Sequence, residues 1–155
     1  GFLACASGAE ANQVNVRAMA SSLGIMVEEV KAHEGPDYAE WMHVEASSDD
    51  GNKVSAGGTF FGGHPWIVRI NGRNVEAVAE GVLFLMNNVD KPGMVGYIGS
   101  LMGEHQVNIA NMSLNRDAAG GEALMILNLD HEPPAALLEK VEGDSSITNV
   151  KVVSI

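Results

Sequence analysis

The segment from residue 82 to residue 109 constrains the fold of this chain more than any other. An apolar run at 82–86 leads into a polar turn that ends in Pro92-Gly93, and apolar residues then recur at helical spacing. The pattern predicts a strand, a tight corner and a helix over 93–102. We expect Pro92 in the first helical turn, where its missing N–H costs nothing. We expect Asp90 to accept hydrogen bonds from the free amides of that turn.

The same corner is the best candidate for a binding site. Free N–H groups at the start of a helix attract a carboxylate or a phosphate, and the Asp90 carboxylate could hold an ammonium. Asn88 and Asn108 each offer a hydrogen-bond donor and an acceptor. These capacities together match a zwitterion such as a free amino acid. The alternative is that Asp90 only caps the helix and that the two asparagines fill turns.

The rest of the second half continues as alternating strands and helices. Strands are expected over 107–115, 123–129 and 147–153, with a turn at 117–121 and a helix over 135–141. The order is therefore βαββαβ, the ferredoxin-like arrangement. In that arrangement two helices cover one face of a four-stranded antiparallel sheet, and the other face or an edge stays free for a partner.

The first half predicts one helix followed by an antiparallel meander. Residues 11–23 have helical spacing and Gly24 ends them, and residues 25–30 are strand-like. Further strands are expected over 40–46, 53–61, 66–70 and 74–78, with hairpin turns at 49–52 and 71–72 and a break at 62–65. The fold class is α+β: an N-terminal helix plus antiparallel sheet domain over 1–80, then the ferredoxin-like domain over 81–155.

Charge and composition exclude several classes of protein. Residues 1–81 carry 5 basic and 11 acidic side chains and residues 82–155 carry 4 and 9, so neither half offers a basic surface to nucleic acid or anionic lipid. The single cysteine, Cys5, excludes an internal disulfide and favours a reducing, cytoplasmic setting. No apolar run approaches the roughly 18 residues of a membrane span. The chain begins with Gly1 and carries no signal peptide, which suggests a piece of a longer protein.

We find no motif for catalysis or for metal binding. None of the five histidines pairs with cysteine or a carboxylate at a ligand spacing, there is no Gly-x-Ser-x-Gly, and Cys5 has no histidine near it in sequence. Gly96 and Gly99 lie in the expected helix and Gly103 at its end, and all three are best explained by close helix packing. A binding or regulatory module therefore fits better than an enzyme.

One further pair of residues suggests an anion site. Arg69 and Arg73 bracket the Asn71-Gly72 turn and could together bind a phosphate. The alternative is that they are two exposed arginines on neighbouring strands.

Residues 82–155 resemble an ACT domain, the small amino-acid-sensing module. The resemblance is carried by NVDKPG at residues 88–93, the helix after it, and VNIA at residues 107–110. More specifically, the chain resembles the C-terminal region of the long-form D-3-phosphoglycerate dehydrogenase family. Residues 14–25 are similar to the VNxxNAxxxAxxxGI stretch of that family's intervening domain, which binds substrate allosterically, and residues 56–62 and 67–72 match its later strands.

The resemblance implies an effector site and a partner. In that family two ACT domains pair side by side into a homodimer, and a tetramer is a further possibility. L-serine or a related small amino acid binds at the seam. The ligand positions fall on Asn88, Asp90 and Asn108, with Pro92, Gly93 and Ile109 beside them. The position of Asn88 is often histidine in the family, so this chain departs from the pattern there.

It also implies a parent enzyme of serine biosynthesis. That enzyme oxidises 3-phosphoglycerate with NAD, in domains that are absent from this chain. Some relatives bind an anion in the intervening domain through basic residues, but Trp66 and Val78 stand where those basic residues can occur. With only Arg69 and Arg73 nearby, we expect that site to be weak or absent.

Two other functions stay open. The chain could be an oligomerisation module that binds no ligand. It could also be the β chain of an iron–sulfur L-serine dehydratase, which joins the same two domain types and needs a cysteine-bearing partner chain.

Overall fold

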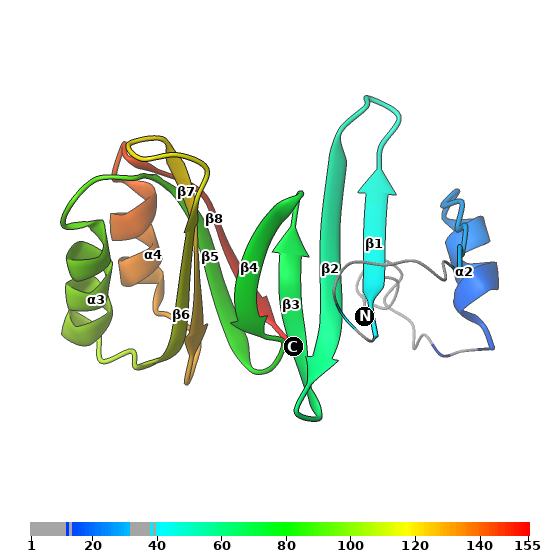
Figure 1. Ribbon diagram of the computed structural model, residues 1–155, viewed down its shortest axis with the longest axis horizontal. Coiled ribbons are helices and arrows are strands. Elements are labelled where there is room, and N and C mark those ends of the chain that lie inside the picture. The colour runs from blue at the N-terminus through cyan, green and yellow to red at the C-terminus, as the bar shows by residue number, and fades with distance from the viewer. Residues whose placement is uncertain (1–11, 13, 32–37, 39) are drawn as a thin grey trace. The chain divides into compact units, whose positions relative to one another are not determined.

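The computed structural model describes residues 12, 14–31, 38 and 40–155 (Figure 1). The chain divides into two compact units, residues 1–35 and residues 36–155. The prediction for Cys5 and the part of the expected helix at residues 11 and 13 lie outside the described residues.

In the first unit, helix α2 (Val16–Ser22) occupies the later part of the expected helix. Gly24 ends it as predicted: its φ of 72° is left-handed, and the Ile25 N–H donates to the Ala20 carbonyl at 2.9 Å. The expected strand over 25–30 is wrong, because these residues pair with no strand among the residues described in this unit.

The second unit begins with an antiparallel meander whose spatial order is β1-β2-β3-β4. Its strands are β1 (Met42–Ser47), β2 (Lys53–Phe61), β3 (His64–Ile70) and β4 (Arg73–Val78). The turns at Gly51 and Asn71-Gly72 adopt positive φ, as the hairpin prediction requires. The expected break at 62–65 is shorter than predicted: Gly62-Gly63 alone makes the turn, and Pro65 joins β3 opposite Phe60.

The second sheet has the predicted βαββαβ order. Its elements are β5 (Val82–Val89), α3 (Met94–Glu104), β6 (Ile109–Arg116), β7 (Glu122–Leu129), α4 (Ala135–Glu142) and β8 (Ile147–Ser154). The strands pair antiparallel in the order β6-β7-β5-β8, with β6 and β8 at the edges. Both helices lie on one face, as Figure 1 shows. The ferredoxin-like prediction is confirmed.

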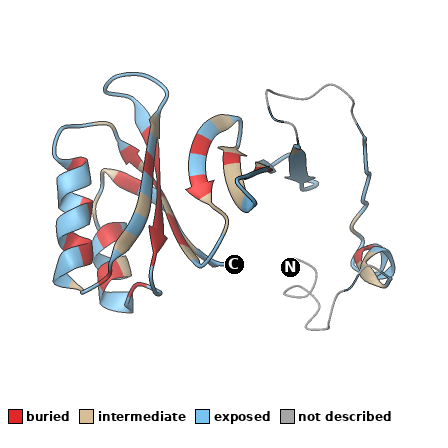
Figure 2. Ribbon diagram, turned by 60° about the horizontal axis from the view of Figure 1, so that its bottom comes forward, coloured by how far each residue is buried: buried red, intermediate tan, exposed pale blue. Residues whose placement is uncertain are grey.

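The main core lies between this sheet and its helices (Figure 2). Phe84, Met86, Ile98, Leu137 and Val141 are all fully buried there. Each such side chain stabilises the fold by roughly 1.5–3 kcal/mol relative to an exposed one.

A second core lies on the opposite face of the same sheet. Val75 and Ala77 of β4 pack with Leu83, Leu124 and Ile126. The amide of Asn128 on β7 donates to the carbonyls of Val78 (2.9 Å) and Glu80 (3.3 Å), which fixes the connection between the two sheets. Near β4 this face is therefore covered, so of the two predicted alternatives, a free face or a free edge, the edge is the one left for a partner there. The expected domain boundary at 80/81 falls in this connection.

Candidate functional site

The corner after β5 differs in detail from the prediction. Helix α3 begins at Met94, and Gly93 is its N-cap with a φ of 91°, a left-handed conformation that favours glycine. Pro92 therefore precedes the helix and does not lie in its first turn. No side chain caps α3, so the expectation that Asp90 is the cap is also wrong.

Asp90 instead binds the turn between β6 and β7. Its Oδ2 accepts hydrogen bonds from the Gly120 amide at 3.2 Å and from Nη1 of Arg116 at 3.1 Å. Its own N–H donates to the Gly121 carbonyl at 2.8 Å. The Gly120 bond and then Arg116 lower the pKa of Asp90, so the carboxylate is ionised at neutral pH. The side chain is 17% exposed and can meet a ligand.

Asn88 lies at the same end of the sheet, on the face that the helices cover. It is only 3% exposed. Its Nδ2 donates to the Val89 carbonyl at 2.9 Å, but its Oδ1 is buried and accepts no hydrogen bond within the described structure. An unpaired buried acceptor costs about 1–3 kcal/mol. A donor supplied by water or by a ligand would remove that cost.

Arg116, the last residue of β6, completes this cluster and was missed by sequence reasoning. Arg116 and Asn88 both lie opposite Ala123 of β7, one on each side of it. Because directly opposed residues share a face of the sheet, both side chains project from the helix-covered face at one level. The only sequence signal was the strand order of the βαββαβ arrangement, which does not give the register.

Asn108 lies at the other end of the sheet. Its Nδ2 donates to Asp130 at 2.9 Å, and the next residue, Ile109, lies opposite Leu129. Ala123 and Leu129 are six residues apart on β7, which separates the two ends by about 20 Å. One copy of the chain therefore brings Asn88, Asp90 and the Pro92-Gly93 corner together with Arg116, but not with Asn108 or Ile109.

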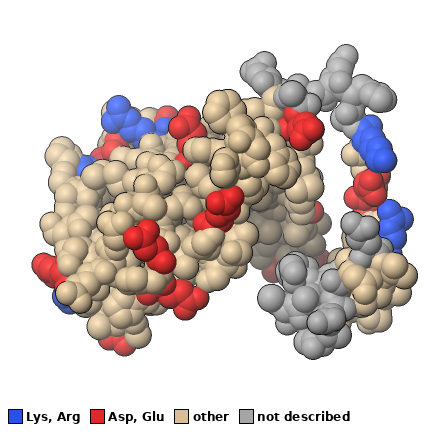
Figure 3. All heavy atoms as spheres, turned by 90° about the horizontal axis from the view of Figure 1, so that it is seen from below, with Lys and Arg blue, Asp and Glu red and all other residues tan. Residues whose placement is uncertain are grey.

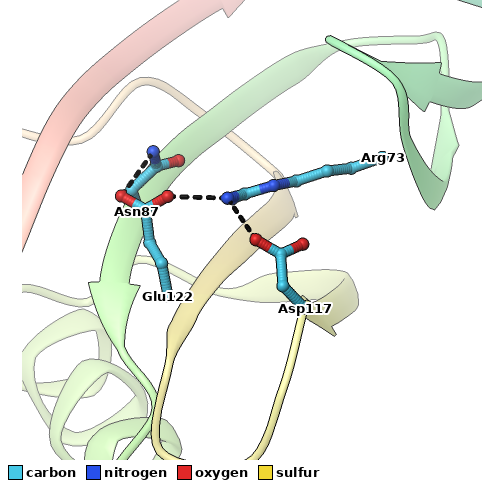
Figure 4. Close-up of polar contacts among 4 residues, drawn as sticks. All are labelled: Arg73, Asn87, Asp117 and Glu122. Atoms are coloured by element: carbon cyan, nitrogen blue, oxygen red, sulfur yellow. Dashed lines mark hydrogen bonds and ion pairs between the residues drawn. The ribbon is translucent and has the colours of Figure 1, made fainter.

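Arg69 and Arg73 do not meet. Arg69 donates to its cross-strand neighbour Asn74 at 3.3 Å and lies over the ring of Trp41 at 5.7 Å. Arg73 lies opposite Ile70, on the other face, where it bonds two carboxylates of the second sheet, Asp117 at 2.6 Å and Glu122 at 2.7 Å (Figure 4). Each guanidinium has another partner, so this structure contradicts the joint anion site.

Neither a metal site nor a membrane-spanning helix occurs among the described residues. No three His, Cys, Asp or Glu side chains among the described residues gather as a metal site. No helix among those residues is long and apolar enough to cross a membrane. On the face drawn in Figure 3, acidic side chains lie dispersed and the described basic ones form no broad patch.

Comparison with known proteins identifies the part of the second unit from β5 to α4. The family model for the ACT domain matches residues 82–144. These residues are an ACT domain. The match begins at the first residue of β5 and extends past α4, so all the residues of the Asn88–Asp90–Arg116 cluster belong to the ACT domain.

The similarity extends beyond the ACT domain to the first sheet. The chain is 33% identical to D-3-phosphoglycerate dehydrogenase of Methanocaldococcus jannaschii over 93% of its length, and 38% identical to that of Mycobacterium tuberculosis over 92%. The enzyme of Synechocystis is 30% identical over the whole chain. The chain spans only 27–28% of the length of these relatives and is homologous to their C-terminal region.

Proposed function

We propose that this chain is the regulatory region of a D-3-phosphoglycerate dehydrogenase, and that two ACT domains bind L-serine or a related small amino acid between them. The similarity to the dehydrogenases over 92% or more of the chain supports the assignment. The parent would oxidise 3-phosphoglycerate with NAD, using the part of the relatives that this chain does not span. The effector would inhibit that reaction as feedback from serine synthesis.

The separation of Asp90 from Asn108 is the observation that carries the proposal. An α-amino acid places its ammonium and carboxylate on one carbon, so it cannot bridge two groups about 20 Å apart. If both residues bind the same effector, as the resemblance implies, the site needs two copies of the chain.

The edge strand β6 offers the surface for such a pair. It bonds to β7 on one side and has no strand partner on the other among the described residues. Met112 and Leu114 in its middle are 41% and 38% exposed. On α3, Gly99 and Gly103 have open space beside them, because a Cβ built at either position has no other heavy atom within 4 Å. Antiparallel pairing of two β6 edges around a twofold axis would place the start of one strand beside the end of the other. Asn108 of one copy would then lie level with Asp90 of the second copy.

Each group has a chemical task in this site. Asp90 Oδ1 accepts no hydrogen bond from the described residues and is available to the ammonium. The second copy's Asn108 would offer amide hydrogen bonds. Asn88 would satisfy its unpaired Oδ1 with a donor from the effector, which requires its side chain to turn out of the core.

Calorimetric titration and thermal unfolding with L-serine test the proposal, with light scattering to establish the dimer. Serine at 100-fold over Kd should stabilise the chain by about 2.7 kcal/mol. Asn108→Ala should weaken binding by about 1–3 kcal/mol, because it leaves a polar group of the effector unpaired. Asn74→Ala, which removes an amide from the first sheet, is the matched control and should bind normally. A confirmed dimer that shows neither binding heat nor a stability change with millimolar serine would reject the proposal.

The other two functions are separated by different observations. An oligomerisation module would form the dimer through the apolar Met112–Leu114 edge and show no response to any amino acid. The dehydratase β chain would require a cysteine-bearing partner, and the similarity to dehydrogenases over both sheets argues against it.

A further inference from the structure

The effector site described so far has no cation for the effector's carboxylate. The expected group was the start of α3, whose first-turn amides no side chain caps. Those amides carry only a partial positive charge, so they supply no cation. Lys91, the residue next to Asp90, is turned away and donates to Ser146 at 3.0 Å. Arg116 is the cation in contact with Asp90, at 3.1 Å.

The contact between Asp90 and Arg116 leaves both groups with free capacity. Arg116 uses only Nη1 in its hydrogen bond, and a guanidinium has five N–H donors. The two described hydrogen bonds of the Asp90 carboxylate both go to Oδ2. The Arg116 side chain is 60% exposed, so a ligand can reach its remaining donors without displacing the protein around it.

An amino acid zwitterion is complementary to an ion pair of this kind. Its ammonium can bind the free oxygen of the aspartate while its carboxylate binds two N–H groups of the arginine fork. The ammonium and carboxylate of the ligand are adjacent, and so are the Asp90 carboxylate and the Arg116 guanidinium. Both contacts can therefore form side by side. Nothing in this arrangement requires the bond between Asp90 and Arg116 to break.

We propose that Arg116 binds the carboxylate of the effector, so that the Asp90–Arg116 ion pair recognises the zwitterion as a whole. The inference rests on the proposed function and specifies the chemistry that its site selects. It excludes amines and amino alcohols as effectors, because they lack the group that Arg116 binds.

A pair of ligands tests this against a role in which Arg116 only orients Asp90. L-Serine and serinol (2-amino-1,3-propanediol) share the ammonium and a hydroxyl, and only serine has the carboxylate. Binding of both to the full chain is measured by calorimetry. The wild type should prefer serine. In Arg116→Gln serine should bind about tenfold more weakly or worse, since a charged hydrogen-bonded pair is lost, while serinol should be unaffected.

Two further variants act as controls. Arg73→Gln removes the other arginine bonded to this hairpin, through Asp117 and Glu122, and should keep the preference for serine. Arg116→Lys keeps the charge without the fork and should show an intermediate preference; it replaces Arg116→Gln if that variant does not fold.

The outcomes separate the two proposals. An equal loss for serine and serinol in Arg116→Gln, or a preference that survives in it, overturns the role of Arg116 and leaves the serine site standing. A wild-type dimer that binds neither ligand rejects the proposed function, and the role of Arg116 fails with it.

Discussion

At the scale of single residues, the absence of a side chain can determine how its neighbours pack. Gly57 is an example in the first sheet, where it lies opposite both His43 and Arg69. The indole of Trp41 lies directly against it, and a Cβ added at Gly57 would overlap that ring. The same indole stacks with His43 at 5.9 Å and lies under Arg69. The absence of a side chain at residue 57 is what allows this stack.

Gly57→Ala should therefore expel Trp41 from its position. We expect a loss of about 1–3 kcal/mol of stability, as for other overpacked sites, and a red shift of Trp41 emission as the ring meets water. The measurement uses Trp66→Phe as background, because the chain has only two tryptophans. Gly99→Ala, at a position with open space, is the control and should not lower stability. Unchanged emission in Gly57→Ala would contradict the stacked geometry.

At the scale of elements, the turn between β6 and β7 is held from two sides. Asp90 binds it from the corner after β5, and Arg73 of β4 binds its two ends, Asp117 and Glu122 (Figure 4). Asn87, next to Asn88, also donates to Glu122 at 3.2 Å. This turn thus contacts both the effector corner and the first sheet. Arg73, and to a lesser extent Asn87, lower the pKa of Glu122 below its usual 4.5.

This network should make stability depend on pH in acid. A carboxylate with a lowered pKa binds its proton more weakly in the folded chain than in the unfolded one. Its contribution is therefore full above the unfolded pKa of about 4.5 and is lost as pH falls through the lower folded value. Urea unfolding between pH 6 and pH 3 should show a shallower decline in Glu122→Gln than in the wild type. Glu139→Gln, an exposed carboxylate on α4, should decline like the wild type, and identical curves for all three would contradict the network.

The elements themselves could largely be predicted from the sequence, whereas their partners could not. Alternating apolar residues and the turn at Asn71-Gly72 gave the strands and hairpins of the meander, because those signals are local. The partner of Asp90 is Arg116, 26 residues away, and depends on the register of β5, β7 and β6, which no local pattern contains. The strand expected over 25–30 failed for the same reason, since a strand also needs a neighbour. Pro92 was placed in the helix because its sequence position fits a first turn, but the left-handed Gly93 delays the helix by one residue.

At the scale of the molecule, the two sheets of the second unit share the core of Val75, Ala77, Leu83, Leu124 and Ile126. That core covers one face of the ACT sheet with the chain's own β4, and α3 and α4 cover the other. Because the faces are covered where β4 and the two helices pack, we expect copies to associate at an edge, and the β6 edge exposes Met112 and Leu114. Under the proposed function, the regulatory unit is a pair of chains.

The placement of Asp90 and Asn108 at opposite ends of one sheet has a genetic consequence. Each site of a pair would take Asp90 from one chain and Asn108 from the other, so Asp90→Ala and Asn108→Ala should each weaken both sites in a homodimer. Mixed and re-associated, the two weakened variants should form heterodimers in which one site has lost both residues and the other has kept both. Half of the serine-binding capacity should therefore return in those heterodimers, which is intersubunit complementation. If verified heterodimers regain no binding, the sites are not shared between chains.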